Sequence, residues 1–192
     1  KIATKVDFEE AVNLFYQHKY DEAVKLFDAI ISQSPNDLLA IAYKQRATAL
    51  NNQVRFTASN ITLADTLASP ALFHGMKEFC KSEYSSENIE LWEMIEQYKK
   101  LDTGSERRNM AELISRDFLS LDGRAAVNIN QQLKDNILQE LSSTHDAAPN
   151  LFYSLQKELE LVMGDTLKRY KATTFVLATL SQTYAPPRLD EL

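Results

Sequence analysis

The chain has 192 residues, enough for one domain or for two small domains that each bury a useful core. Hydrophobic residues make up 44% of it and charged residues 25%, as in an ordinary globular protein. The formal net charge of −6 argues against nucleic acid or an anionic membrane surface as the main partner. Cys80 is the only cysteine, which excludes an internal disulfide and a cysteine metal cluster and fits a reducing, intracellular setting.

Targeting signals are absent from the sequence. No apolar run approaches the roughly 18 residues needed to span a bilayer, and no signal peptide is visible. We therefore expect a cytoplasmic protein without a membrane span. Because the chain begins with Lys1 and not with Met, we also expect a fragment whose native targeting segment is missing.

The first third of the chain carries a helical apolar pattern. Three helices are expected: one around residues 5–17, one over the apolar stripe at residues 23–31, and one around residues 38–52. Pro35 ends the second helix, because the residue before a proline is pushed out of the α region. The stripe of the second helix consists of Ala23, Leu26, Phe27, Ile30 and Ile31. The expected inner residues of the third helix are Leu39, Ala42, Tyr43, Ala47 and Leu50.

Two of these helices and their proline turn form a 34-residue unit over residues 4–37, a period typical of the tetratricopeptide repeat (TPR). The positions that resemble the repeat are Ala11, Tyr20, Ala23, Phe27 and Pro35. The chain departs from the pattern at Asp7 and Ile30. Residues 1–53 are thus expected to form about one and a half repeats. A structural or interdomain role is favoured, with binding of another protein as the alternative.

Helices resume after a break in the apolar pattern. Residues 51–53 interrupt that pattern, and residues 57–60 are expected to continue as a polar linker. Apolar positions at helical spacing then recur from residue 61, broken at residues 102–105, 122–123 and 144–149. Gly164 is expected to interrupt or bend a further helix. No segment reads as a strand, so the predicted class is all-α.

Four separated segments in this second region carry a specific resemblance. Residues 79–92, with the sequence FCKSEYSSENIELW, resemble the central signature of the RGS (regulator of G-protein signalling) domain. Residues 98–100, 127–129 and 165–170 match further family segments in the same order. The domain is expected over residues 61–185, followed by a tail over 186–192.

The resemblance implies a nine-helix RGS-type bundle preceded by about three TPR-like helices. In the family, three of these segments meet at one end of the bundle: the first is residues 79–92, the second is 127–129 and the third is 165–170. Together they contact the mobile switch segments of the α subunit of a heterotrimeric G protein (Gα). Asn128 would insert toward the nucleotide site, and Asp165 and Arg169 would pair across one helical turn. The contact residues implied by the resemblance are Glu83, Tyr84, Glu87, Asn88, Asn128, Leu161, Asp165, Thr166 and Arg169.

Other features are expected to be structural. At Met76 the family commonly has an aromatic residue, and Asn130 and Lys134 replace an Asp/Arg pair. The expected core aromatic and leucine residues are Phe79, Leu91, Trp92, Phe118 and Phe175. Three dispersed histidines, four dispersed glycines and one cysteine supply no metal site, phosphate loop or nucleophile, so no catalytic residue, metal or cofactor is expected. The histidines are His18, His74 and His145.

The expected function is therefore GTPase activation, with GTP-bound, transition-state-like Gα as the partner and no chemistry by this chain. Gα supplies its own arginine and glutamine, so its partner needs only to brace them. Gα would recruit the protein to the inner face of the plasma membrane. The first alternative is a non-activating scaffold or adaptor that uses an RGS-like domain and TPR helices for protein binding. A second is a TPR adaptor with the bundle as a passive spacer.

Overall fold

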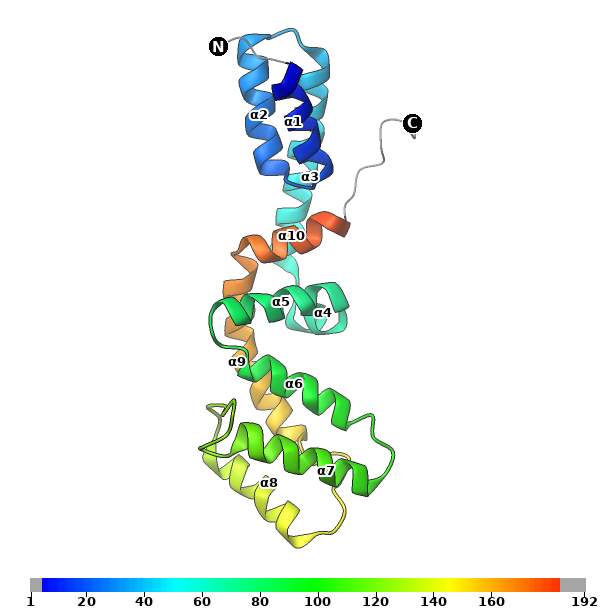
Figure 1. The fold of residues 1–192 in the computed structure, drawn as a ribbon, viewed down its shortest axis with the longest axis vertical. Coiled ribbons are helices and arrows are strands. Elements are labelled where there is room, and N and C mark those ends of the chain that lie inside the picture. Colours follow the sequence, from blue (N-terminus) through cyan, green and yellow to red (C-terminus); the bar gives the residue numbers. More distant parts are fainter. Residues whose placement is uncertain (1–4, 184–192) are drawn as a thin grey trace. The chain divides into compact units, whose positions relative to one another are not determined.

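The computed structural model describes residues 5–183 of the chain, and all regular structure in that range is helical, which confirms the all-α class (Figure 1). The elements are α1 (Lys5–Tyr16), α2 (Tyr20–Gln33), α3 (Leu38–Asn60), α4 (Leu63–Ala68), α5 (Pro70–Ser82), α6 (Glu87–Tyr98), α7 (Gly104–Ile114), the π-helical turn η1 (Ser115–Leu119), α8 (Gln131–Ser143), α9 (Tyr153–Lys171) and α10 (Thr174–Thr183).

The chain divides into two compact units. The first comprises residues 1–75 and 170–192, and the second comprises residues 76–169. Helices α5 and α9 therefore contribute to both units. The domain boundaries expected from the sequence, at residues 53, 61 and 185, stay predictions, and the expected tail over 186–192 lies outside the described residues.

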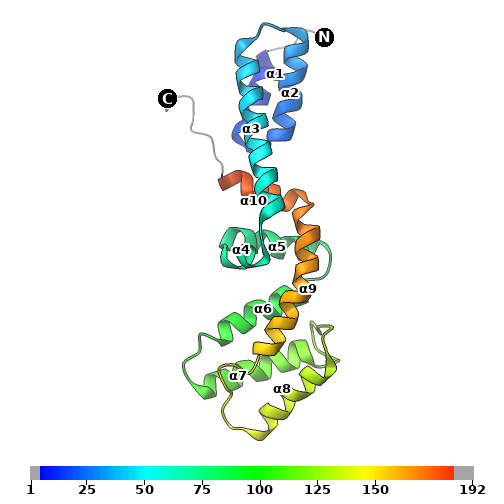
Figure 2. The same ribbon diagram turned by 180° about the vertical axis from the view of Figure 1, so that it is seen from behind.

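Helices α1, α2 and α3 of the first unit lie side by side (Figure 2), and aromatic side chains form the core between them. The ring of Tyr43 stacks on Phe27 with centroids 5.5 Å apart and meets Phe15 edge-on at 5.4 Å. Small residues on each helix are fully buried, which lets the backbones approach closely. They are Ala11, Ala23, Ala40 and Ala47. The predicted stripe of the second helix is confirmed, since its residues are buried or half-buried.

The inner face of α3 differs from the expectation. Tyr43 and Ala47 are buried as predicted, but Leu39 is 55% exposed and Ala42 is exposed, whereas Ala40 lies inside. The helix begins at Asp37, whose carboxylate accepts from Ala40 N at 3.0 Å. That start points position 40 inward, so the stripe follows a 40–43–47 spacing and leaves residues 39 and 42 outside.

The prediction of a polar linker at residues 57–60 is wrong, because helix α3 continues through Asn60. Val54 and Ala58 are buried and extend the inner stripe of the helix past the polar residues. Asn51 faces α2, where its amide donates to Asp21 at 2.6 Å. In the same unit α10 packs against α3 and buries Val176. Tertiary packing of the second half of α3 thus overrides the weak local pattern.

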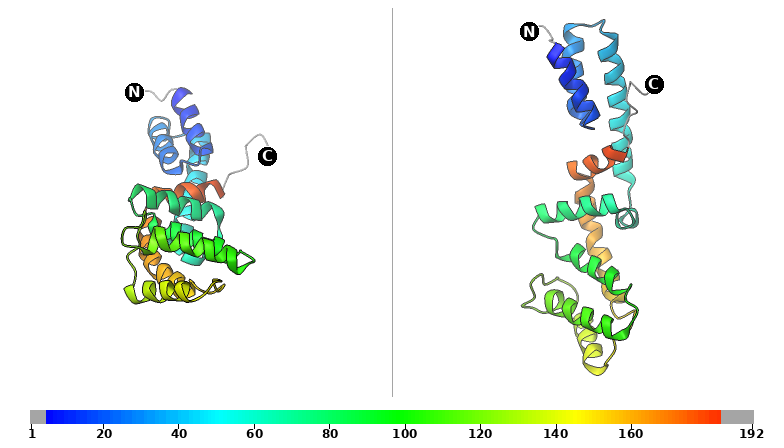
Figure 3. Two further views of the ribbon diagram at one scale, coloured as in Figure 1. Left: turned by 60° about the horizontal axis from the view of Figure 1, so that its bottom comes forward. Right: turned by 45° about the vertical axis from the view of Figure 1, so that its right-hand side comes forward.

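The second unit packs α6, α7 and α8 as neighbours, and Figure 3 shows them side by side. The predicted break at residues 102–105 is the start of α7, where Thr103 and Glu106 cap each other reciprocally. Helix α9 runs through Gly164 without the expected interruption, because one glycine costs a helix only about 1 kcal/mol relative to alanine. The largest fully buried residues of this unit are Met76, Ile89, Leu91, Ile95, Tyr98, Ile114, Phe118 and Phe152.

Two residues expected in the core lie at its edge. Trp92 is half-buried on α6, and Phe175, which belongs to the first unit, is 37% exposed on α10. Phe79, Leu91 and Phe118 are buried as predicted. Each of the two exceptions lies next in sequence to the buried stripe of its helix, and a helix turns a side chain by about 100° per residue.

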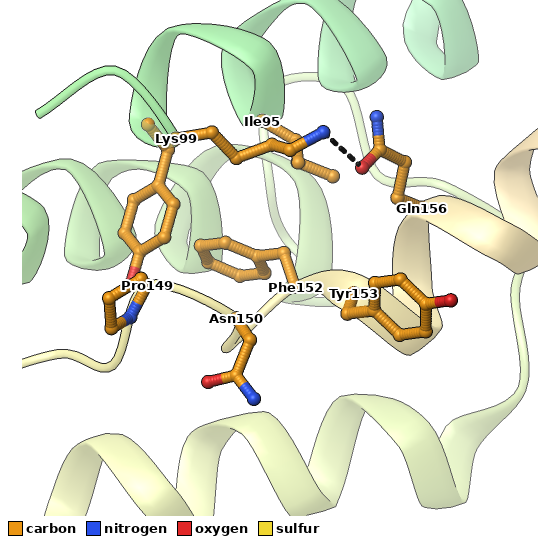
Figure 4. Close-up of a pocket in the computed structure, with 8 residues that line it drawn as sticks. Ile95, Lys99, Pro149, Asn150, Phe152, Tyr153 and Gln156 are labelled. Carbon is orange, nitrogen blue, oxygen red and sulfur yellow. Dashed lines mark hydrogen bonds between the residues drawn. The ribbon is translucent and has the colours of Figure 1, made fainter.

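The Tyr-Lys-Lys segment at the end of α6 has a structural role. The Tyr98 hydroxyl donates to Ala148 O, and its ring packs edge-on against Phe152 at 4.9 Å. Lys99 Nζ donates to Glu96 at 2.6 Å and to Gln156 at 3.1 Å. Figure 4 shows these side chains around a cavity of about 130 Å³ between α6 and the start of α9. The segment therefore fixes the start of α9 against α6.

Candidate protein-binding site

The turn between α5 and α6 holds an exposed tyrosine in a left-handed conformation. Tyr84 has φ of 54°, and its side chain is 98% exposed. Tyr84 N donates to Lys81 O at 3.1 Å and Ser85 N to Cys80 O at 3.0 Å, so the helix closes in a Schellman motif. A non-glycine residue in this conformation costs about 1–2 kcal/mol. The turn thus presents the Tyr84 ring to solvent from a strained but hydrogen-bonded backbone.

The first turn of α6 contains polar atoms that are buried without a partner. Ser85 Oγ and Asn88 Oδ1 have no hydrogen-bond partner in the part of the chain that the structure describes. Ser86 occupies the N-cap position but donates to Glu90 at 2.7 Å and not to the helix backbone. Glu87 follows in the first turn, where the helix dipole favours its charge. Strain and unpaired polar atoms in one short segment are typical of functional sites.

The loop before α8 exposes Asn128 between two anchored neighbours. Val127 is 2% and Ile129 is 9% exposed, whereas Asn128 between them is exposed. Val127 N donates to Phe118 O at 2.9 Å, which attaches the loop to η1. The alternation of buried and exposed residues therefore directs the Asn128 amide outward from a fixed backbone.

Two residues that depart from the family pattern also anchor this loop. Lys134 is only 5% exposed, and its Nζ donates to Val127 O at 2.6 Å. Asn130 caps α8, since its Oδ1 accepts from Gln132 N at 2.8 Å, and its own N donates to Glu158 at 2.6 Å. Sequence reasoning missed Lys134 as a positioning residue, because a lysine ordinarily indicates a solvated position.

The predicted turn at residues 122–123 brings the loop back against η1. Gly123 N donates to Ser120 O at 3.1 Å, and Ala125 N donates to Asp117 O at 2.9 Å. A Cβ atom at Gly123 would lie 2.6 Å from Asp117 O, closer than such contacts allow. Only glycine fits this approach of two backbones, so Gly123 sets the path of the loop toward Asn128.

The third predicted segment lies on α9. Leu161 is 79% exposed and Asp165 is exposed, but Thr166 is 9% exposed and faces the interior. The predicted pair between Asp165 and Arg169 is wrong. Asp165 instead accepts from Lys168 at 2.8 Å, and this ammonium holds the pKa of the carboxyl below its usual range.

Arg169 reaches the first segment. Its Nη2 donates to Glu83 Oε2 at 2.9 Å and its Nε to the same oxygen at 3.2 Å, a two-pronged contact between residues 86 apart in the chain. The Glu83 carboxylate raises the pKa of the guanidinium above its usual value. A planar guanidinium suits this geometry, because two of its nitrogens donate to one carboxylate.

The three predicted segments therefore meet within the second unit. The Glu83–Arg169 pair joins the first segment to the third. A groove of about 490 Å³ lies between the first segment and the residues that lead into the second, because the α5–α6 turn and residues 124–126 line it together. Figures 1 and 2 show that turn and the loop before α8 on the same side of the unit.

Comparison with known proteins identifies the family. The sequence model for the regulator of G protein signaling domain matches residues 62–176, more than half of the chain. The chain belongs to the RGS family. All nine predicted contact residues lie inside the matched range. The TPR-like segment over residues 1–53 lies outside that range and stays a prediction.

Individual relatives agree with this assignment. Regulator of G-protein signaling 5 of Rattus norvegicus is 32% identical over 104 residues, covering 54% of this chain and 56% of that protein. Regulator of G-protein signaling 21 of Homo sapiens is 30% identical over 107 residues, covering 52% and 70%. Regulator of G-protein signaling 8 of Macaca fascicularis is 28% identical over 177 residues, covering 86% and 87%. The chain thus spans little more than half the length of the first of these relatives.

Among residues 5–183 no three His, Cys, Asp or Glu side chains are placed to hold a metal ion. Within the same range no helix is both long and apolar enough to cross a membrane. Burial raises the pKa of the Cys80 thiol to about 11, so this cysteine is protonated near neutral pH.

Proposed function

We propose that this RGS chain accelerates GTP hydrolysis by Gα and supplies no catalytic chemistry of its own. The observation that carries the proposal is that segments distant in sequence lie close together in the second unit. The α5–α6 turn contacts α9 through Glu83 and Arg169 at 2.9 Å, and it lines a groove with residues 124–126, which precede the exposed Asn128. Two hydrogen bonds, from Val127 N and from Lys134, fix the loop that carries Asn128.

Gα already holds its own arginine and the glutamine that orients the attacking water. A partner accelerates the reaction when it stabilises the switch segments in the conformation of the transition state. The Asn128 amide can donate and accept at once, which suits it to bracing two polar groups of Gα together. Each tenfold acceleration requires about 1.4 kcal/mol, and two or three added hydrogen bonds of about 0.5–1.5 kcal/mol each supply that amount.

Rigidity of the site supports this role. Ordering a mobile side chain or loop on binding costs free energy, so a preformed surface binds and braces more effectively. Asn128 lies between two buried residues, and its loop is attached to η1 and to α8. The short polar side chains of the site therefore meet the mobile switch segments from a fixed frame.

The proposed contact surface has three parts. The first consists of Glu83, Tyr84, Glu87 and Asn88, and the second is Asn128. The third consists of Leu161, Asp165, Thr166 and Arg169, of which Thr166 offers the least surface, at 9% exposed. Leu161, one helical turn before Asp165 on α9, contributes exposed apolar area.

Single-turnover GTP hydrolysis tests the proposal. Several purified Gα subunits are loaded with GTP, and hydrolysis is followed with and without the full chain. We expect acceleration for at least one subunit. A folded chain that accelerates none of them would overturn the proposal, and binding to Gα without acceleration would favour the non-activating scaffold.

A further inference from the structure

The groove beside Asn128 contains residues that the predicted contact set does not include. It is lined by Lys81, Tyr84, Ser86 and Glu87 of the first segment and by Arg124, Ala125 and Ala126, which directly precede the second. The two alanines leave space in the groove, since neither side chain extends past Cβ. The backbone there is also fixed, because Ala125 N donates to Asp117 O at 2.9 Å.

Arg124 is the cation on this rim that is least engaged by acids of the chain. Its side chain is 67% exposed, and its Nε lies 3.8 Å from Asp117. Asp117 is already paired more closely with Arg116, at 2.7 Å. Lys81, the other cation of the groove, is paired with Glu78 at 2.6 Å. The guanidinium of Arg124 is therefore available to a carboxylate from outside.

The one acid that lines the groove is not a strong competitor for Arg124. Glu87 lies in the first turn of α6, where the backbone N–H groups and the helix dipole compensate its charge. Glu83, the acid nearest in sequence to Tyr84, is held by Arg169. With Lys81 and Arg124 on the rim, the groove favours an anionic group.

We propose that this groove receives an acidic side chain of Gα, with Arg124 as its ion-pair partner. The inference rests on the proposed function, because Gα is the partner that function supplies. Tyr84 and the two alanines line the groove, and the small alanine side chains leave room for a carboxylate that larger residues at positions 125 and 126 would exclude. Arg124 thereby sets affinity and choice among Gα subunits, whereas Asn128 acts on the rate of the bound complex.

Charge reversal at two matched arginines tests this inference. R124E and R116E change the same charge, lie eight positions apart and contact the same Asp117. Any effect transmitted through Asp117 would be larger in R116E, whose contact is closer. A126E supplies a second probe, because it places a carboxylate in the lining of the groove and leaves both arginines intact. Melting temperatures of all three variants are recorded first.

The measurement is the concentration of chain that half-maximally accelerates single-turnover hydrolysis by a responsive Gα. Rim charges act mainly on association and are screened by salt, so R124E and A126E should raise this concentration about five- to tenfold at low salt. R116E should stay within about twofold, and the rate at saturation should be unchanged in all three. At about 0.5 M salt the differences should shrink, because the screening length falls to a few ångströms.

Equal shifts for R124E and R116E, or an R124E variant that lowers only the saturating rate, would overturn the inference and leave the proposed function intact. A wild-type chain that accelerates no Gα would instead overturn the proposed function, and this inference with it. Retention of full affinity by A126E would show that the groove stays empty in the complex.

Discussion

Among residues 5–183, each of the two units contains one non-glycine residue in the left-handed conformation, at a turn between two helices. In the first unit His18 has φ of 62°, is half-buried, and its Nδ1 lies 3.0 Å from the Tyr20 hydroxyl. In the second unit Tyr84 has φ of 54°, and its side chain is 98% exposed. The strain at His18 is accompanied by packing inside the protein, whereas the strain at Tyr84 presents a side chain to solvent. Backbone strain alone therefore does not distinguish the turn of the proposed contact surface from an ordinary turn; the exposure of the strained side chain does.

The largest effect is expected where the first unit depends on its aromatic core. Phe27→Ala removes a fully buried ring that stacks on Tyr43, and should cost about 3–5 kcal/mol of unfolding free energy. Phe56→Ala, at a residue 72% exposed, should change stability little. Urea denaturation measures both variants. A similar loss in the two would show that the aromatic core is not what stabilises this unit.

A smaller but more consequential effect is expected at Lys134. Lys134→Met keeps the buried chain but leaves Val127 O without its donor, which should cost about 1–3 kcal/mol. The loop that carries Asn128 should loosen, so GTPase activation should fall at a temperature where the variant is still folded. Lys100→Met, at an exposed position, is the control. Full activation by the Lys134 variant would show that this anchor does not position Asn128.

The left-handed residues themselves provide a sharper test of the comparison. Tyr84→Gly relieves the backbone strain and should raise the unfolding free energy by about 0.5–1 kcal/mol while lowering activation. His18→Gly relieves similar strain but removes the contact with Tyr20, so it should give no net gain. Thermal melts and single-turnover hydrolysis are measured on both. Equal gains in stability would mean that the His18 contact contributes nothing.

The smallest effect concerns pH. Burial raises the pKa of Cys80 to about 11 in the folded chain, above its unfolded value of about 8.5. Below the unfolded value both states are protonated and stability is unaffected. As pH rises from that value through about 11, only the unfolded state ionises, so stability falls. Cys80→Ala should reduce this slope in melts between pH 8 and pH 10, and an unchanged slope would assign it wholly to other groups such as the buried tyrosines.

Much of the fold could be predicted from sequence because its helices follow the 3.6-residue period closely. The stripe of α2 and the cap at Asp37 are local features, and the structure agrees with both. The last turns of α3 and the continuity of α9 through Gly164 could not be predicted, because they depend on packing and not on local preference.

The site shows the same division. The segments that contain the predicted contact residues followed from the resemblance, but the partners of those residues within the fold did not. Arg169 pairs with a residue 86 positions away, and no helical spacing indicates that choice over the nearby Asp165. Lys134 is buried against a backbone carbonyl, an acceptor that leaves no trace in the sequence. The availability of Arg124 to a partner depends on which other charges of the groove are already paired, and only the structure shows those pairs.

The central claim is that Asn128 braces Gα from a rigid frame. The most direct measurement compares the wild-type chain with Asn128→Ala in single-turnover GTP hydrolysis by a responsive Gα, with the melting temperature of each recorded. Because the side chain is exposed and its loop is anchored by other residues, the variant should melt like the wild type and lose at least about tenfold of the acceleration, the equivalent of about 1.4 kcal/mol. A variant that melts normally and still activates fully would contradict the account.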